Sequence, residues 1–201
     1  MHIVGLGGSF RVPSTSLSAL RVALRAAMTD SDVDVDLLDL RTLDLPPNGS
    51  AGPCAGVSRL VRAAAAADAM IWSAPMYHGT VSGAFKNAVD WLDELAGLDP
   101  PFLTNRPVGL IATAAGAQAL QAVNTMEFAV RALRGWVVPF VVPVNAAQDA
   151  FRADGTIADR ALAGRLSALG SMVAQGARCF AGTAAPAVRG RAEQWTTGLA
   201  G

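Results

Sequence analysis

Cysteine, histidine, tyrosine and charge of either sign are all scarce in this chain of 201 residues. Charged residues make up 16% of the chain and cancel to a net charge of zero. Without a basic excess nothing points to a nucleic-acid partner, and without an acidic excess nothing points to a charged protein partner. Hydrophobic residues reach 52%, so the composition excludes a disordered chain.

The few cysteines and histidines exclude two further classes of protein. Cys54 and Cys179 stand in no metal-binding or redox spacing, and two cysteines are too few for a disulfide framework. His2 and His78 are far apart in the sequence and have no companion ligands beside them, so we expect no metal site.

Long apolar runs are also absent. No run approaches the roughly 18 residues that span a membrane, and the first residues lack the basic region and long apolar stretch of a signal peptide. We therefore expect a cytoplasmic protein with no membrane partner. The length predicts one domain over residues 1–181, followed by a tail at 182–201 that is rich in Gly, Ala and Arg.

Short apolar runs alternate with helical patterns along the chain, which predicts an α/β protein with a five-stranded parallel sheet covered on both faces. The alternating apolar and acidic residues at 33–38 indicate an edge strand, and the wholly apolar run at 69–74 a central one. The expected strands are 2–6, 33–38, 69–74, 108–112 and 137–142, and the expected helices are 16–28, 57–67, 84–96, 120–134 (ended by Gly135) and 157–179. Ligands of such sheets bind at the carboxyl ends of the strands, here the loops at 7–15, 75–83 and 113–118.

The loop at 7–16 carries the donors expected of a phosphate site. It follows a strand and opens a helix, whose free N–H groups and partial positive charge attract anions. Its side-chain donors are Ser9, Arg11, Ser14, Thr15 and Ser16. An ordinary N-cap would explain one hydroxyl but not four hydroxyls and an arginine. No lysine is present for a P-loop, and Phe10 replaces the third glycine of a dinucleotide fingerprint, so a terminal monophosphate fits best.

The loop at 75–83 is a second candidate. Pro75 and two glycines indicate an unusual backbone course, and Tyr77 can pack against a planar ligand; an ordinary turn with a surface tyrosine is the alternative. Lys86, the single lysine, either forms a solvated i, i+4 pair with Asp90 or contacts a ligand.

These residues carry a family resemblance. Gly-Ser-Phe-Arg-Val-Pro-Ser-Thr-Ser (8–16) and Ala-Pro-Met-Tyr-His-Gly-Thr-Val-Ser-Gly-Ala-Phe-Lys-Asn-Ala-Val-Asp-Trp-Leu (74–92) resemble, in order and spacing, the two motifs of the NADPH-dependent FMN reductase family. The resemblance implies a flavodoxin-like three-layer sandwich that holds FMN, takes electrons from NADPH or NADH, and passes them to free flavin or another small acceptor. It also implies a homodimer or homotetramer.

The resemblance implies a set of cofactor-binding residues. The phosphate would meet Ser9, Arg11, Ser14, Thr15 and Ser16, and the flavin ring would lie beside Pro75, Met76, Tyr77, His78 and Gly79, with Thr113, Ala114 and Gly116 along its other edge. His78 stands where the family often has Asn, Met76 where Glu is frequent, and Ser16 where Asn is often seen. A flavin carries the redox chemistry itself, so no catalytic residue is required; His78 and Tyr77 are the candidates.

Two other functions stay open on the same scaffold. One is a flavodoxin-like electron carrier, although such carriers are markedly acidic and have a Thr-rich phosphate loop. The other is a quinone, azo or nitro reductase. A thiol phosphatase is disfavoured because the phosphate loop lacks cysteine. For the oligomer, Trp91 falls off the helix face of Phe85 and Leu92, so we expect it to be exposed at a subunit interface, with Trp195 of the tail as a second candidate contact.

We expect the bound flavin to be FMN and not FAD, because the phosphate loop is compact and the dinucleotide fingerprint is absent. Heat release of the flavin followed by chromatography identifies it. Recovery of FAD alone, or no flavin affinity in the micromolar range, contradicts this prediction.

Overall fold

The computed structural model describes residues 1–29, 32–50, 52, 54–152 and 154–181. The expected tail at 182–201, with Trp195, lies outside the described residues. Within the described part, none of the helices is long and apolar enough to cross a membrane.

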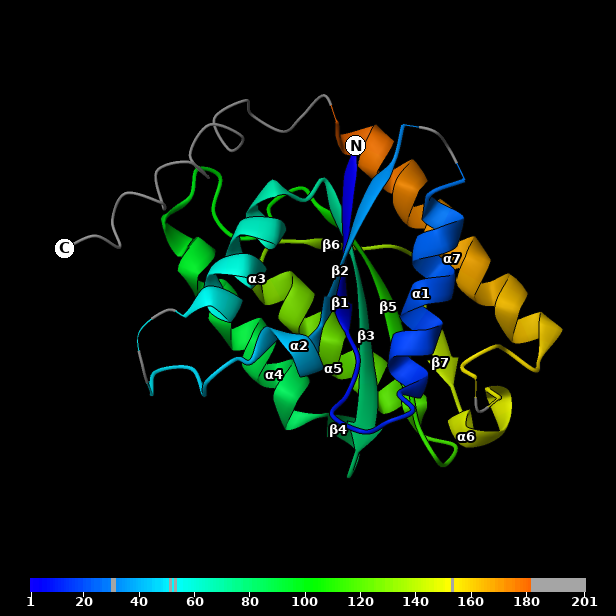
Figure 1. Cartoon of the computed structure of the whole chain (residues 1–201). Helices are drawn as coiled ribbons and strands as arrows, with labels where there is room; N and C mark the ends of the chain where they lie inside the picture. Colours follow the sequence, from blue (N-terminus) through cyan, green and yellow to red (C-terminus); the bar gives the residue numbers. More distant parts are fainter. Residues whose placement is uncertain (30–31, 51, 53, 153, 182–201) are drawn as a thin grey trace.

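The centre of the molecule is a parallel sheet with the strand order β2-β1-β3-β5, whose fifth position is shared by two short strands that both pair with β5 (Figure 1). A seventh strand, β4, pairs antiparallel with the end of β3. The strands are β1 (His2–Gly7), β2 (Asp34–Asp39), β3 (Ala69–Tyr77), β4 (Thr80–Val81), β5 (Pro107–Thr113), β6 (Trp136–Val137) and β7 (Val142–Val144).

Helices cover both faces of this sheet, which confirms the three-layer sandwich (Figure 1). One face packs against α1 (Thr15–Ala27) and α7 (Arg160–Phe180). The other packs against α3 (Ala55–Ala66), α4 (Gly83–Asp90), the 3₁₀ helix η1 (Trp91–Gly97) and α5 (Ala119–Ala132). Two short helices, α2 (Leu40–Leu43) and α6 (Ala147–Ala150), follow β2 and β7.

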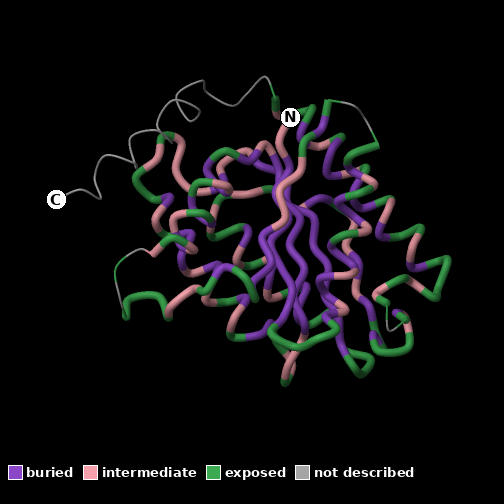
Figure 2. Tube along the Cα trace, in the orientation of Figure 1, coloured by how far each residue is buried: buried purple, intermediate pink, exposed green. Residues whose placement is uncertain are grey.

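Alternation along the strands builds the two apolar layers. Ile3 and Ile71 pack into the layer under α1 and α7, whereas Val4 and Trp72 pack into the opposite layer. The central strands are buried along most of their length, while the loops at the carboxyl edge are largely exposed (Figure 2). As predicted, β2 is the edge strand.

The third strand is longer than the apolar pattern predicts. It continues past Ala74 to Tyr77, because Pro75 still pairs with Thr113 and Met76 pairs with Val81 of β4. The segment predicted as a loop at 75–83 is therefore mainly a β-hairpin.

The fifth strand is divided where a single strand was expected. Val138 donates its N–H to the carbonyl of Val108, but Pro139 has no N–H to continue the ladder, and pairing resumes only at Val142. The last helix begins at Arg160 and not at Ile157, since Ile157 forms a bridge with Phe151 and Asp159 provides the N-cap.

The end of α5 differs in detail from the expectation for Gly135. The left-handed residue is Arg134, with φ 62°. Gly135 follows it and donates its N–H to the carbonyl of Val130 at 2.9 Å, the pattern of a Schellman motif. A Cβ at Gly135 would lie 3.0 Å from a methyl of Val130, so glycine serves here for close packing.

The expectation that Trp91 is exposed is wrong. Its side chain is only 3% exposed, and its indole N–H donates to the carbonyl of Pro46 at 2.8 Å. The α-helix ends at Asp90, so the 3.6-residue period used to place Trp91 off the core face stops there. The Lys86–Asp90 ion pair is confirmed and lies in solvent.

A buried arginine joins the end of α3 to the start of β5. Arg106 donates from Nη1 to the carbonyl of Ala64 at 2.6 Å and from Nη2 to that of Ala65 at 2.7 Å, so it binds carbonyls in the last turn of α3. Burial lowers the pKa of Arg106 to about 10, and the nearby charge of Asp68 opposes the shift. The guanidinium therefore stays protonated at neutral pH.

Substitutions at two glycines of α7 can test how closely this helix packs on α1. A methyl group at Gly170 would overlap the carbonyl of Ala23, whereas nothing lies within 4 Å of one at Gly164. We expect Gly170→Ala to lower the free energy of unfolding by about 1–3 kcal/mol or more through overpacking. Gly164→Ala is expected to raise it by roughly 0.5–1 kcal/mol through helix propensity. Urea denaturation measures both, and shifts in the same direction would contradict the packing.

Candidate functional site

The three loops predicted to carry chemistry meet at one edge of the sheet. Strands β1, β3 and β5 lie side by side and end at this edge, at the bottom of Figure 1. From β1 the chain continues to β2, which lies on one side of β1, and then crosses to β3, which lies on the other side. The edge therefore includes the topological switch point between β1 and β3. Open parallel sheets bind their ligands at this place.

The serines of the first loop form a buried chain of hydroxyl groups. Ser9 Oγ lies 3.2 Å from Ser14 Oγ and donates to it, and Ser14 Oγ lies 3.2 Å from Ser16 Oγ. Each of the three residues is at most 8% exposed. Ser14 is also the N-cap of α1 and accepts the N–H of Leu17 at 3.3 Å. The N-cap therefore accounts for one hydroxyl of the three.

The start of α1 is rich in donors. Within the described part of the chain, the N–H groups of Thr15 and Ser16 have no hydrogen-bond partner, and the first turn of the helix contains no acidic residue. The guanidinium of Arg11 forms no ion pair with a described carboxylate and lies 5.0 Å from the centre of the Tyr77 ring. This combination of unpaired N–H groups, hydroxyls and a guanidinium without a carboxylate partner is the donor set of an anion site.

Backbone contacts with β3 fix the position of this loop. Gly8 donates its N–H to the carbonyl of Ser73 at 3.2 Å, and the hydroxyl of Ser73 donates to the carbonyl of Ser16 at 2.8 Å. A side chain at Gly7 would overlap the same Ser73 carbonyl, and Gly8 has φ 102°, a conformation that L-residues rarely adopt. Glycine is therefore required at position 7 by the close approach of the Ser73 carbonyl, and at position 8 by the positive φ of the backbone.

The second loop is a hairpin with a two-residue turn. His78 and Gly79 form the turn with φ 50° and 86°, the positive values that a type I′ turn requires. Helix α5 supports the hairpin from behind: Thr80 Oγ1 lies 3.3 Å from Thr125 Oγ1. The His78 side chain is exposed, while Met76 and Tyr77 are half-buried in the strand that leads to the turn.

The third loop leaves β5 at Thr113. Thr15 Oγ1 donates to Thr113 Oγ1 at 3.4 Å, which joins the first loop to the third. Beyond the buried Ala114, residues 115–118 are exposed, and their N–H groups have no hydrogen-bond partner among the residues described. Gly116 thus lies in a short segment whose backbone donors face solvent.

A fourth segment reaches this edge that the sequence analysis did not include. Asn145 Oδ1 accepts the N–H of Ala119 at 3.0 Å, and Gln148 Nε2 donates to the carbonyl of Ala115 at 3.3 Å. Both residues follow β7 and hold the third loop in place. The signal was available, because β7 ends at the same carboxyl edge as the strands before it.

The structure thus brings most of the predicted residues to one edge, though not all as exposed side chains. Thr15 meets Thr113, and Arg11 meets Tyr77. Pro75, Thr113 and Ala114 are buried in or beside the strand ends, so their side chains shape the edge from beneath. Within the described residues, no group of three or more His, Cys, Asp or Glu side chains is placed to hold a metal ion.

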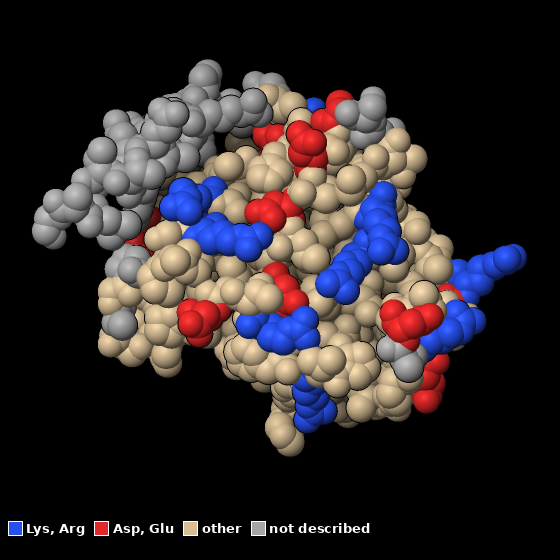
Figure 3. Space-filling model, viewed as in Figure 1, with Lys and Arg blue, Asp and Glu red and all other residues tan. Residues whose placement is uncertain are grey.

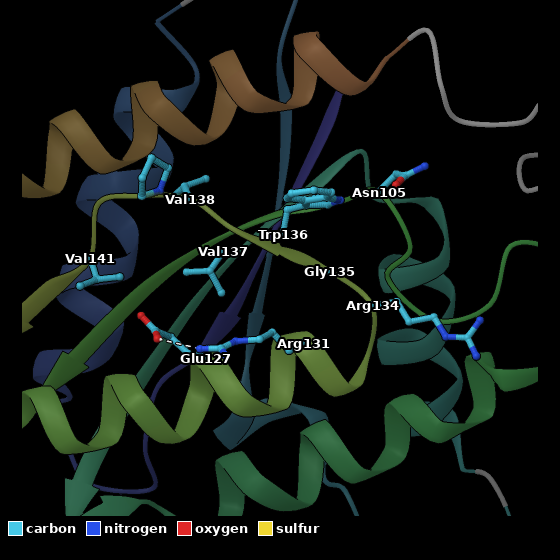
Figure 4. Close-up of a pocket in the computed structure, with 10 residues that line it drawn as sticks. Asn105, Glu127, Arg131, Arg134, Gly135, Trp136, Val137, Val138 and Val141 are labelled. Atoms are coloured by element: carbon cyan, nitrogen blue, oxygen red, sulfur yellow. Dashed lines mark hydrogen bonds and ion pairs between the residues drawn. The ribbon is translucent and has the colours of Figure 1, made fainter.

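A separate hollow of about 690 Å³ lies beside β6 (Figure 4). Trp136 and Val137 line it together with Glu127 and Arg131 of α5, which form an ion pair at 3.5 Å. Because β6 pairs with the first residues of β5, this hollow lies away from the carboxyl edge. Its lining contains no residue of the first loop, and we do not count it as part of the site.

Comparison with known proteins agrees with this arrangement. The model of the NADPH-dependent FMN reductase family matches residues 1–149, which include every loop of the site described above. This chain belongs to the NADPH-dependent FMN reductase family. It is accordingly an FMN-dependent NAD(P)H oxidoreductase, as its two motifs predicted.

Individual relatives are consistent with the family. The chain is 30% identical, over 156 residues, to the FMN-dependent NADPH-azoreductase of Staphylococcus aureus (strain USA300), which covers 74% of this chain and 79% of the relative. It resembles the apo form of the NADH:FMN oxidoreductase EMOB, with a TM-score of 0.69, 20% identity and coverage of 87% and 88% of the two chains.

A second structural neighbour is the NAD(P)H:(acceptor) oxidoreductase FerB from Paracoccus denitrificans, with a TM-score of 0.68 at 22% identity. The alignment covers 89% of this FMN reductase family member and 97% of FerB. At such identities the two structures show the fold alone, and they confirm the flavodoxin-like architecture.

Proposed function

We propose that this FMN reductase family member holds the FMN phosphate at the start of α1 and transfers electrons from NAD(P)H to free flavin or a small planar acceptor. The observation that carries the proposal is the cluster of Ser9, Ser14 and Ser16 hydroxyls beside the unpaired N–H groups of Thr15 and Ser16. The donor set fits a terminal monophosphate, which offers three acceptor oxygens at one point.

The residues that we expect to contact the flavin ring lie in the two neighbouring loops. The hairpin of Met76, Tyr77 and His78 provides one wall, and the exposed N–H groups at 115–118 provide donors for the polar edge of a flavin. When bound, FMN supplies the two-electron chemistry that connects NAD(P)H to an acceptor. The protein's part is to bind the phosphate, orient the ring and shape the space beside it. His78, at the exposed turn, is placed to donate a hydrogen bond to an acceptor's oxygen or nitrogen.

Similarity to the azoreductase favours azo compounds among the acceptors, and quinones and nitroaromatics share the same planar shape. The experiment is steady-state NADPH and NADH oxidation by the purified protein with FMN, an azo dye, a quinone or a nitroaromatic. Turnover without any protein partner supports an enzyme. An absence of turnover with all four acceptors would refute the proposed function and favour an electron carrier.

We also propose a homo-oligomer in the cytoplasm. Trp91 is buried within the subunit and gives no support for an oligomer. Phe128 of α5 and Trp136 of β6 are 69% and 56% exposed, and aromatic residues are enriched at interfaces. The cytoplasmic location follows from the proposed use of NAD(P)H, which the cell interior supplies. Light scattering at micromolar concentration tests the oligomer.

Arg11→Ala is expected to weaken FMN binding while the fold stays intact, because Arg11 is exposed and outside the apolar core. A hydrogen bond to a charged group contributes about 1.5–3 kcal/mol, so the Kd for FMN should rise about tenfold or more. Arg11→Lys keeps the charge but loses the two-pronged geometry, so an intermediate Kd is expected. Fluorescence titration of FMN gives both Kd values. An unchanged Kd in Arg11→Ala would indicate that the FMN phosphate binds at another place.

Met76 and His78 are expected to choose between acceptors. His78→Asn preserves the positive φ of the turn, since Asn adopts this conformation readily, so the variant changes the side chain without straining the hairpin. Met76→Glu replaces an apolar wall by a charge. We expect the ratios of kcat/KM between free FMN, a quinone and a nitroaromatic to change more than twofold. Ratios within about twofold, roughly 0.4 kcal/mol, would show that these side chains do not select the acceptor.

A further inference from the structure

A groove leads away from the phosphate loop along one side of α1. Two hollows of about 370 and 350 Å³ lie there on either side of Ser18 and Gly155, which line both and approach each other closely. The nearer hollow begins at Pro13 and Thr15 of the phosphate loop, and the farther one reaches Arg25. Ten residues separate Thr15 from Arg25, which corresponds to about 15 Å of helix. The groove therefore suits an extended ligand that starts beside the flavin site.

Two arginines without partners line the far part of this groove. Arg21 and Arg25 lie one turn apart on the exposed face of α1, and neither has an ion-pair or hydrogen-bond partner among the described residues. Basic side chains along α1 are visible on the face shown in Figure 3. In contrast, Arg152 of the near part is already used, since its Nη1 donates to Thr156 Oγ1 and to the carbonyl of Ile157. Two unpaired guanidinium groups in one groove are suited to a phosphate.

The groove also contains one carboxylate. Asp154 Oδ1 accepts hydrogen bonds from the Thr156 hydroxyl at 2.7 Å and from the Thr156 N–H at 2.9 Å. These bonds lower the pKa of Asp154, so it remains ionised at neutral pH. In dinucleotide sites a carboxylate accepts a hydrogen bond from the 2′-hydroxyl of NAD, whereas an arginine holds the 2′-phosphate of NADP. On a 2′-phosphorylated ribose the hydroxyl left for a carboxylate is the 3′-hydroxyl. The two groups together match a phosphorylated ribose.

We propose that this groove binds the adenosine half of NADPH, with Arg21 and Arg25 on the 2′-phosphate and Asp154 beside the ribose. The inference rests on the proposed function, in which a reduced nicotinamide nucleotide is the electron donor, and it makes NADPH the preferred donor over NADH. The adenylate half of FAD has similar chemistry but lacks a 2′-phosphate, so it leaves the two arginines without their ligand.

The test uses the FMN-loaded protein and three alanine variants: Arg21→Ala, Arg25→Ala and the double variant. Adenosine 2′,5′-bisphosphate is titrated by calorimetry, with 5′-AMP as the matched ligand that lacks the 2′-phosphate. We expect the double variant to bind the bisphosphate at least about tenfold more weakly, with the affinity for 5′-AMP little changed. In steady state, the KM for NADPH should rise by a similar factor while kcat and the KM for NADH stay the same. Arg62→Ala, an exposed arginine of α3 on the opposite face, is the control.

Each other outcome has a distinct meaning. Unchanged bisphosphate affinity in the double variant overturns the assignment, as does an equal rise in the KM for NADPH and NADH. If FAD binds more tightly than FMN and loses that advantage in the variants, the groove takes the flavin's adenylate and the NADPH assignment is wrong. If no variant and no wild-type protein oxidises NAD(P)H, the proposed function fails, but the calorimetric titration still reports whether the groove recognises a 2′-phosphate.

Discussion

The carbonyl of Ser73 fixes the geometry on which the site depends. It accepts the N–H of Gly8, while the Ser73 hydroxyl donates to the carbonyl of Ser16, so β3 holds both ends of the loop at residues 7–16. Only glycine fits at position 7, because any side chain there would overlap this carbonyl. With the loop held in this way, the hydroxyls of Ser9, Ser14 and Ser16 gather at the start of α1 and its free N–H groups point out of the fold.

The same edge of the sheet gathers the other parts of the site. Thr15 contacts Thr113 and Arg11 lies over Tyr77, so the first loop is in contact with the end of β5 and with the hairpin that follows β3. Residues after β7 hold the third loop through Asn145. The protein therefore offers a rigid frame with few side-chain functions, as expected of an oxidoreductase whose cofactor carries the chemistry. The groove along α1 extends this frame toward a second ligand.

Two departures from the expected elements have identifiable structural causes. The strand that ends in Tyr77 was predicted to stop at Ala74, where the apolar run ends, but Pro75 still pairs with Thr113 of β5. Trp91 was placed on the surface by a helical period that does not continue into the 3₁₀ helix. Both cases show pairing or packing from another part of the chain overriding the local pattern.

The amino-acid sequence by itself determined the layer order, the edge position of β2 and the donor set at residues 9–16, because apolar periodicity and helix-start chemistry are local properties. It also determined the family, since two motifs occur in the right order. Only the tertiary structure decided which donors meet, that His78 lies in a positive-φ turn, and that Arg21 and Arg25 share a groove with Asp154. Most of these features depend on segments that are distant in the sequence, such as those of Thr15 and Thr113 or of Arg21 and Asp154, and no local pattern encodes their contacts.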